Sequence, residues 1–291
     1  MRYRNDIIVK NLNMDQVSWS RTFCDSAEYE GIRVVESPVD DYQNRLFIGD
    51  TISSRMLGKR ACNIYFLAAV DGTDEEHDNI LKTTYTTTVS NAEKERVMRI
   101  FPDVDHNKIE VDGFPVDLNT IAGMADMQLD KIDRSVCFLG RTDADKGIGM
   151  ELGLTECLSA DGYSVFHLTP HAASARLELE RAGSQVIEQL RGEDYLKLLS
   201  RMNCVVNTSP RESLFVSGIE AAALDIPVIA PDVADSGIWD WNDPENFYQA
   251  EDTDDAIKAI RRVCKKDTVS AVTIDQYQPF RYFDRTFGRA A

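Results

Sequence analysis

The chain has 291 residues, of which 43% are hydrophobic, and 49 acidic side chains against 32 basic ones give a formal charge of −17. A field this negative opposes non-specific binding to nucleic acid or anionic lipid, and the hydrophobic content is typical of globular proteins. The length favours two domains over one. No apolar run approaches the ~20 residues of a membrane-spanning helix, and charges interrupt the start, MRYRNDIIVK, where a signal peptide would be apolar. We therefore expect a cytoplasmic protein.

The acidic excess has two interpretations. Repulsion among like charges destabilises a compact state, and dissolved salt screens that repulsion. A charge of −17 therefore fits a protein from a salt-rich, halophilic cytoplasm. An ordinary acidic cytosolic protein is the alternative, because net charge alone reports on solubility and association rather than on habitat.

The N-terminal part of the chain alternates apolar runs with helical patterns. The residues Asn91–Ile100 have helical spacing, and Ser90 or Asn91 stands where an N-cap is preferred. The apolar runs predict strands at Asp6–Lys10, Ile32–Glu36, Leu46–Gly49, Asn63–Ala69 and Lys108–Val111.

The C-terminal part shows the same alternation more clearly. The uninterrupted apolar run Ser135–Leu139 is typical of a parallel strand that is covered on both faces. Further strands are predicted at Tyr163–Leu168, Gln185–Ile187, Cys204–Asn207 and Val228–Ala230, and helices at Gly147–Ser159, Glu193–Arg201 and Asp254–Lys265. This order predicts doubly wound α/β sheets, with a domain boundary in the Asp-rich stretch Asp117–Arg134.

The first candidate motif is GRTDADKG, from Gly140 to Gly147, directly after the strand at Ser135–Leu139. Ligands of open α/β sheets bind at the carboxyl ends of the strands, which is where this loop lies. Arg141 and Lys146 can both point at one anion, such as a diphosphate that gains negative charge as a bond to it breaks. Two surface cations on a loop would give the same pattern.

The same loop offers a possible metal site. Asp143 and Asp145 form an Asp-x-Asp pair, which can hold a divalent cation that bridges phosphates. We expect no metal here, because acids are abundant in the chain and the loop carries its own cations. The six cysteines include no Cys-x-x-Cys pair, so we expect reduced thiols rather than a zinc cluster.

The second candidate motif is ESLFVSGIE, from Glu212 to Glu220, with seven residues between the two acids. It follows the predicted strand CVVN, and a helix is expected to begin within Phe215–Ser217. The free backbone N–H groups of that helix could bind phosphate or sugar oxygens. A carboxylate accepts two hydrogen bonds from vicinal hydroxyls, as a sugar or ribose requires. A loop acid and an acid near a helix N-terminus are the plain alternative.

Together with the Ala-rich helix and the strand PVIAP that follow, these two motifs resemble the donor-binding signature of retaining GT-B glycosyltransferases of family 4. The resemblance implies two Rossmann-like domains facing each other across a cleft, with a shortened N-terminal domain. It places the acceptor-side domain at 1–118, a hinge at 119–134, the nucleotide-sugar domain at 135–274, and a helix packing back on the first domain at 275–291. It also implies a donor site formed by Gly140, Arg141, Lys146, Glu212, Leu214, Phe215, Val216 and Glu220.

The resemblance assigns roles to some of these residues. Arg141 and Lys146 would hold the diphosphate, Glu212 the donor sugar, and Glu220 the ribose; Glu212, Arg141 and Lys146 are the candidate catalytic residues. One position departs from the family's pattern: Phe215 stands where a Gly is usual. Gly lets a backbone approach a ligand closely, so the donor geometry is in question.

The N-terminal domain matches the family less well. The stretch Thr87–Asp117 resembles the family's last segment before the hinge, and 10–19 contains no Gly where the family often has a Gly-rich loop. Residues after the strand at Asn63–Ala69 are the acceptor-side candidates: Asp71, Thr73 and His77. The aromatic, basic tail Gln276–Phe287 is expected to be the returning helix rather than a nucleic-acid site.

The implied function is transfer of a hexose-type sugar from a nucleotide-sugar to an acceptor, with retention at the anomeric carbon and without a cofactor or metal. The acceptor is open and could be a glycan, a lipid, a protein or a modified nucleobase. A nucleotide-sugar epimerase and a non-catalytic binding subunit of the same fold are the alternatives.

Overall fold

The computed structural model describes residues 5–9, 33–35, 44–48, 57, 62–125, 127, 129–169, 173–264 and 275–288. The chain divides into two compact units, one formed by Met1–Asp117 with Asp275–Ala291 and the other by Leu118–Ile274. Along the chain the division between the units falls after Asp117 and again before Asp275; the hinge at 119–134 stays a prediction. The stretch 10–19, which contains no Gly where the family often has a Gly-rich loop, lies outside the described residues.

The first unit contains a six-stranded sheet of order β2-β1-β3-β4-β5-β6, in which all neighbouring strands pair in parallel. Its strands are β1 (Asn5–Val9), β2 (Arg33–Val35), β3 (Asn44–Ile48), β4 (Asn63–Leu67), β5 (Tyr85–Thr88) and β6 (Ile109–Val111). Its helices are α2 (Asp74–Lys82), α3 (Asn91–Ile100), α10 (Pro279–Gly288) and the 3₁₀ helices η1 (His106–Lys108) and η5 (Asp275–Tyr277).

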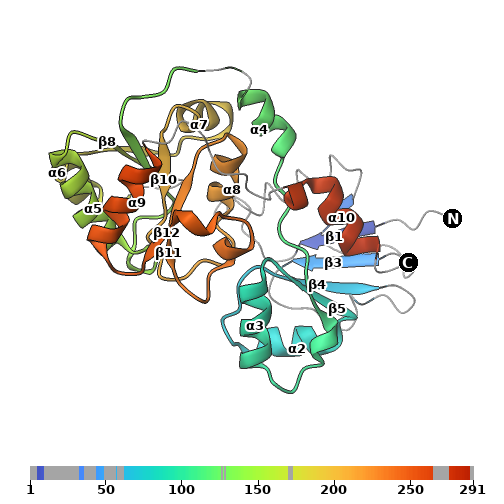
Figure 1. Ribbon diagram of the computed structural model, residues 1–291. Coiled ribbons are helices and arrows are strands. Elements are labelled where there is room, and N and C mark those ends of the chain that lie inside the picture. Colours follow the sequence, from blue (N-terminus) through green and yellow to red (C-terminus); the bar gives the residue numbers. More distant parts are fainter. Residues whose placement is uncertain are drawn as a thin grey trace. The chain divides into compact units, whose positions relative to one another are not determined.

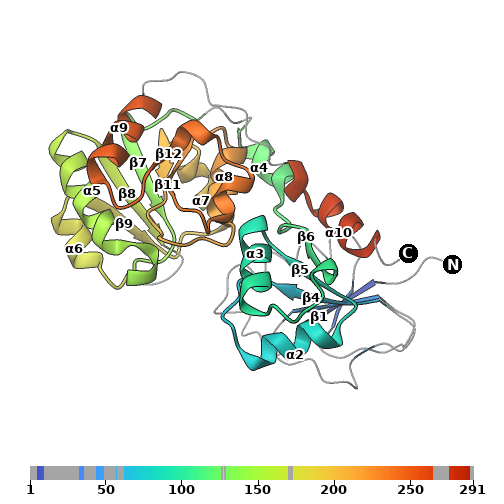
Figure 2. The same cartoon turned by 60° about the horizontal axis from the view of Figure 1, so that its bottom comes forward.

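Helices cover both faces of this first sheet. Tyr65 and Leu67 of β4 pack with Ile80 of α2 and Val97 of α3 in one core. Figure 2 shows α2 and α3 on one side of the sheet and α10 on the other. Strands that are buried on both faces in this way read as apolar runs, which is why β4 was recognisable in the sequence.

Helix α10 is joined to the first unit by specific contacts. The side chain of Arg285 donates to the carbonyl of Asp112 over 2.6 Å, and the backbone N–H of Val116 donates to the carbonyl of Tyr277 over 2.7 Å. Gly113 has a φ of +82°, and a Cβ there would lie 2.8 Å from the ring of Tyr277. The aromatic tail therefore lies against the segment that ends the first unit.

The second unit contains a second six-stranded parallel sheet, of order β12-β11-β10-β7-β8-β9. Its strands are β7 (Ser135–Leu139), β8 (Ser164–Thr169), β9 (Ser184–Glu188), β10 (Cys204–Val206), β11 (Val228–Asp232) and β12 (Phe247–Gln249). Its helices are α4 (Leu118–Ala125), α5 (Ile148–Ala160), α6 (Arg176–Arg181), α7 (Gly192–Leu199), α8 (Val216–Ala223), α9 (Thr253–Val263) and the 3₁₀ helices η2 (Ala144–Lys146), η3 (Gly237–Asp240) and η4 (Pro244–Asn246).

This second sheet is doubly wound. Val136 and Phe138 of β7 pack with Leu154 of α5 and Ile260 of α9, whereas α7 and α8 lie on the opposite face (Figure 1). From β7 the chain moves outward through β8 to β9, then returns to place β10 on the other side of β7 and continues to β12. The direction of winding reverses between β7 and β10, and such a switch point is where open α/β sheets bind ligands.

Candidate functional site

The switch point of the second sheet brings the two sequence motifs together. The loop Gly140–Gly147 follows β7, and the loop Asn207–Phe215 follows β10, the strand next to β7. Both loops leave the sheet at the carboxyl ends of parallel strands, so they lie at the same edge. Adjacency of β7 and β10 is the reason that residues far apart in the chain can act on one ligand.

An ion pair joins the two loops. Lys146 Nζ donates to Glu212 Oε1 over 2.6 Å, and the two side chains are 26% and 11% exposed. The same carboxylate oxygen accepts from Ser209 Oγ at 2.8 Å and from Asn207 Nδ2 at 3.4 Å. Glu212 is thus held by three donors, all of them at the switch point.

The backbones of the two loops are also in close contact. Gly147 has a φ of +80°, and a Cβ on it would lie 2.2 Å from the carbonyl oxygen of Thr208. The Thr208 hydroxyl is 2.9 Å from the carbonyl oxygen of Lys146. Only glycine fits at position 147, because both the left-handed conformation and the neighbouring carbonyl exclude a side chain. This approach fixes the position of Lys146 relative to Glu212.

Arg141 is paired within its own loop. One guanidinium nitrogen donates to Asp143 Oδ2 over 2.7 Å, and the other donates to Asp145. Desolvation and the hydrogen bond with Asp145 raise the pKa of Asp143, and the same hydrogen bond lowers the pKa of Asp145. The structure therefore pairs Arg141 with the Asp-x-Asp residues and Lys146 with Glu212, so the two cations have different partners. Within the described ranges, no three His, Cys, Asp or Glu side chains gather as a metal site.

Two helices begin at this edge of the sheet. Helix α5 begins after Gly147 and α8 begins after Phe215, and no side-chain hydrogen bond caps either first turn. The unpaired N–H groups and the dipole at a helix N-terminus favour an anion. Val216 is the first residue of α8, and the buried Leu214 accepts a hydrogen bond at its carbonyl from Trp241 Nε1 over 3.1 Å.

The residue that departs from the family's pattern keeps a glycine-like backbone. Phe215 has φ 63° and ψ 66°, which is the left-handed conformation. Its ring is buried, and a Cβ on Gly218 would lie 2.3 Å from it. Phe215 thus adopts the backbone conformation that a glycine would adopt at this position. Its ring packs against the first turn of α8 at Gly218.

Glu220 lies one turn further along α8 from that start. Its Oε2 accepts a hydrogen bond from the hydroxyl of Tyr195 on α7 over 3.1 Å. Desolvation raises the pKa of Glu220 to about 7, although the Tyr195 hydrogen bond acts in the opposite direction. A carboxyl with this pKa can either accept or donate a hydrogen bond near neutral pH.

Sequence reasoning missed four polar residues around these motifs. Asn207 and Ser209 follow an apolar strand directly, and polar residues at a strand end are a signal that could have found them. Glu151 lies on the face of α5 that carries Leu154, an apolar spacing that places it inside. Tyr195 has no signal, because its contact depends on how α7 packs beside α8.

The acceptor-side candidates lie in the first unit, after β4. Glu76 accepts hydrogen bonds from the backbone N–H groups of Asp71, Gly72 and Thr73, at 2.7 to 3.1 Å. Thr73 is the N-cap of α2, and its hydroxyl accepts from the N–H of Glu76 in a capping box. His77 is a residue of α2, with Nε2 3.0 Å from Asp103 Oδ2.

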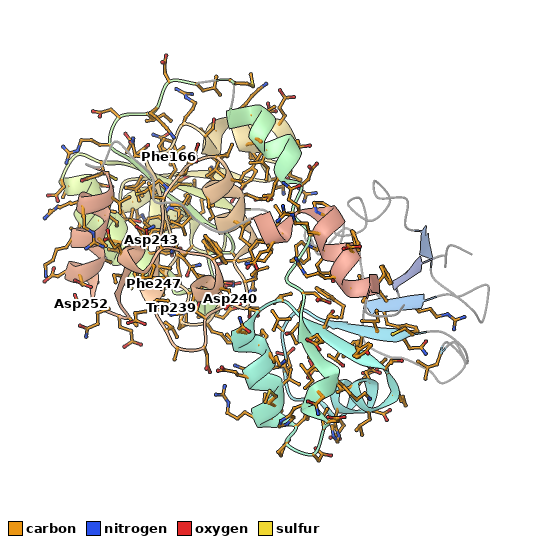
Figure 3. All side chains as sticks on the ribbon, turned by 45° about the vertical axis from the view of Figure 1, so that its right-hand side comes forward. Phe166, Trp239, Asp240, Asp243, Phe247 and Asp252 are labelled. Atoms are coloured by element: carbon orange, nitrogen blue, oxygen red, sulfur yellow. The ribbon has the colours of Figure 1, made fainter. Side chains whose placement is uncertain are left out.

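Two aromatic rings of the second unit stack on each other. Trp239 of η3 and Phe247 of β12 stack with ring centroids 3.7 Å apart and an interplanar angle of 4° (Figure 3). Trp239 remains 40% exposed. Two residues before it, the N–H of Gly237 donates to the carbonyl of Glu212 over 2.8 Å, so η3 supports the loop that carries the candidate site.

No protein-family model matches the sequence, and a search of curated proteins by sequence gives no match. Solved structures do resemble it. A glycosyltransferase from Rickettsia africae ESF-5 has a TM-score of 0.66 at 11% identity over 100% of this chain and 95% of that one. Anabaena Alr3699/HepE in complex with UDP and glucose has a TM-score of 0.65 at 12% identity over 98% and 96%.

A third solved structure agrees with these two. The lipopolysaccharide outer core galactosyltransferase WaaB, in its apo form, has a TM-score of 0.62 at 13% identity over 98% of both chains. At these identities the likeness is one of fold. No helix in the described part of the chain combines the length and the apolar character that crossing a membrane requires. The chain therefore has the α/β GT-B fold of these glycosyltransferases, with two doubly wound parallel sheets.

Proposed function

We propose that the chain is a retaining GT-B glycosyltransferase that moves a hexose-type sugar from a nucleotide-sugar to an acceptor. One observation carries the proposal: Lys146 and Glu212 meet over 2.6 Å at the switch point, between two helices whose first turns have no side-chain cap. A cation, a carboxylate and two helix N-termini without a side-chain cap are groups that suit a sugar diphosphate.

The cations would act on the leaving group. As the bond between the anomeric carbon and the diphosphate oxygen breaks, negative charge grows on the diphosphate. Lys146, Arg141 and the first turn of α8 would stabilise that charge more in the transition state than in the bound substrate. The ligand would take Lys146 from Glu212, and Arg141 from Asp143 and Asp145.

The carboxylates would hold the rest of the donor. Glu212, released from Lys146, would accept hydrogen bonds from sugar hydroxyls, and Glu220 would accept them from the ribose. The acceptor hydroxyl would attack the face that the diphosphate leaves, and its proton would pass to a diphosphate oxygen. Sugar transfer then balances without a protein nucleophile, and the anomeric configuration is retained.

Arg141→Ala tests the role of the first cation. Release of nucleoside diphosphate from the accepted donor should fall by ~10²–10³, the usual scale for losing one preorganised transition-state contact. Arg181→Ala, on the exposed end of α6, is the matched control and should release nucleotide at the wild-type rate. Turnover of Arg141→Ala within a few-fold of wild type would remove Arg141 from the mechanism.

The two rival functions predict different products. An epimerase would convert the nucleotide-sugar with no acceptor present and would keep the bond to the diphosphate. A non-catalytic subunit would bind a partner and release no product with any donor, alone or with a cell extract. Chromatography of the donor after incubation separates all three outcomes.

A further inference from the structure

A buried acid and a buried imidazole face each other beneath the candidate site. Glu151 lies in the first turn of α5 and His167 on β8, and they are 6% and 1% exposed. Glu151 Oε2 is 3.6 Å from His167 Nε2. The imidazole ring stacks on Phe138 with ring centroids 4.6 Å apart, so its plane is fixed. Neither facing atom has a hydrogen-bond partner among the described residues.

The other nitrogen of His167 defines the tautomer. His167 Nδ1 is 2.7 Å from Ser184 Oγ, which is also 3.2 Å from the carbonyl oxygen of Val165. A carbonyl only accepts and a hydroxyl has one proton, so both contacts are hydrogen bonds only if Ser184 donates to Val165 and accepts from Nδ1–H. In that tautomer Nε2 carries a lone pair, which points toward Glu151.

A proton on Glu151 would remove the repulsion between Glu151 Oε2 and His167 Nε2. Two lone pairs would face each other if the carboxyl were ionised, whereas a protonated Oε2 can donate to Nε2 after a small rotation. Burial raises the pKa of Glu151 to about 7 and lowers the pKa of His167 to about 3. The proton therefore belongs to the acid, and the imidazole is neutral.

The second oxygen of Glu151 lies close to a hydroxyl that also contacts the backbone of Lys146. The Thr208 hydroxyl is 3.1 Å from Glu151 Oε1 and 2.9 Å from the carbonyl oxygen of Lys146. Its single proton can serve one of these acceptors at a time. A carboxylate attracts that proton more strongly than a neutral carboxyl does, because hydrogen bonds to ionised groups are about twice as strong.

We infer that Glu151 is a positioning residue for Lys146: as a neutral acid it donates to His167 and leaves Thr208 to hold the backbone of Lys146, whereas as a carboxylate it draws Thr208 away. This inference rests on the nucleotide site proposed above. The neutral form also keeps a negative charge away from a site that would bind a diphosphate.

Several charged or titratable side chains from neighbouring elements face Glu151 and affect its protonation. Asp143 raises the pKa of Glu151 and Lys146 lowers it, both through their charges, and Glu151 in turn raises the pKa of the Tyr248 phenol. His167 is a further titratable neighbour. Because Lys146 interacts with Glu151 through charge, a diphosphate bound at Lys146 should raise the pKa of Glu151 further.

The first test observes the proton in the wild-type protein. In protein labelled with ¹³C at the Glu carboxyls, the Glu151 resonance, assigned by through-bond experiments, should titrate with a midpoint near pH 7. This measurement needs neither a folded variant nor a ligand. A midpoint near the ordinary value of 4.5 would overturn the inference, whatever the function of the protein.

The second test measures the coupling to the site. The Kd for UDP is determined calorimetrically at about pH 5.5 and about pH 8.5 for wild type, Glu151→Gln and Glu156→Gln. Gln keeps a neutral donor and acceptor, so the ratio of wild-type Kd to Glu151→Gln Kd should rise roughly tenfold between these pH values. The ionisation of UDP itself is common to all three proteins and cancels in that ratio.

The outcomes separate this inference from the proposed function. Glu156 is exposed on the same helix, so the Kd of Glu156→Gln should follow wild type at both pH values. A pH-independent ratio for Glu151→Gln, with UDP bound by both proteins, would overturn the positioning role alone. If UDP does not bind, the same ratio is measured with whichever of GDP, ADP and dTDP does bind, and a failure of all four nucleotides with a titration midpoint near pH 7 would contradict the proposed function and the coupling that rests on it.

Discussion

Burial sets the charges of two residues in the core of the second unit. Glu151 is held toward the neutral acid and His167 toward the neutral imidazole, because neither can be hydrated when charged. These shifts affect stability in opposite directions. The raised pKa of Glu151 stabilises the fold below the unfolded value of 4.5, and that stabilisation is lost as the pH rises through 7. The lowered pKa of His167 stabilises the fold above 6.5 and is lost as the pH falls toward 3.

Glu151→Gln isolates the first of these two effects. The difference in unfolding free energy between wild type and this variant should move in favour of the variant by ~3 kcal/mol as the pH rises from about 4.5 to about 8. The contribution of His167 is present in both proteins and largely cancels. Urea unfolding at a series of pH values measures the difference, and a difference that does not change with pH would contradict a raised pKa.

The residues of the candidate site differ in how far the sequence could place them. Lys146 and Glu212 stand in the loops that follow two apolar runs, and those runs become neighbouring strands, so the proximity of the two loops follows from the topology of an open sheet. The pairing of Arg141 with Asp143 and Asp145 depends on loop conformation, and the contact between Glu220 and Tyr195 depends on helix packing. Neither contact can be predicted from hydrophobic periodicity, which is the clearest structural signal in a sequence.

The conformation at the start of helix α8 depends on two residues that pack against each other, Phe215 and Gly218. Phe215 occupies a left-handed conformation, which costs about 1 kcal/mol or more for a residue with a Cβ. Gly218 leaves room for its ring, and a glycine inside a helix costs about 1 kcal/mol relative to alanine. The two costs belong to one packing arrangement, so the two positions should not behave independently.

The effect of Gly218→Ala should therefore depend on the residue at position 215. In the wild-type protein the added methyl meets the Phe215 ring and should destabilise by ~1–3 kcal/mol. In a Phe215→Gly background that ring is gone, while the Trp241 ring, 3.0 Å from the added methyl, still opposes the gain in helix propensity, so the same substitution should change stability by less than about 1 kcal/mol. A double-mutant cycle by chemical unfolding measures the coupling, and equal effects in both backgrounds would show that the ring does not lie over Gly218.

Other elements show what the sequence does and does not determine. Strand β7 begins and ends as predicted. Its five apolar or small residues are typical of a buried strand, and a charged segment before them and a glycine after them mark its two ends. Strand β12 has three residues and β5 reads Tyr-Thr-Thr-Thr, so both lack an apolar run. Helix α2 was missed although its capping box, from Thr73 to Glu76, was legible in the sequence.

At the scale of the whole molecule, the charge of −17 acts on both units. Repulsion among the excess acids opposes folding and is screened within ~10 Å at ~0.1 M salt and within ~3 Å at ~1 M. If the protein belongs to a salt-rich cytoplasm, its Tm should rise steadily from dilute buffer to molar KCl. Differential scanning calorimetry measures this, and a Tm that stays constant or falls would contradict the halophilic interpretation.

The proposed function requires the edge of the second sheet, at Lys146 and Glu212, to bind a nucleoside diphosphate. A thermal-shift panel of UDP-, GDP-, ADP- and dTDP-sugars in molar KCl tests it directly on wild type, Lys146→Ala and the exposed control Lys258→Ala. Ligand at about 100 times its Kd should stabilise the wild type and the control by ~2.7 kcal/mol. One nucleotide that stabilises these two proteins but not Lys146→Ala is the predicted result. No stabilisation by any nucleotide, or equal stabilisation of all three proteins, would contradict the claim.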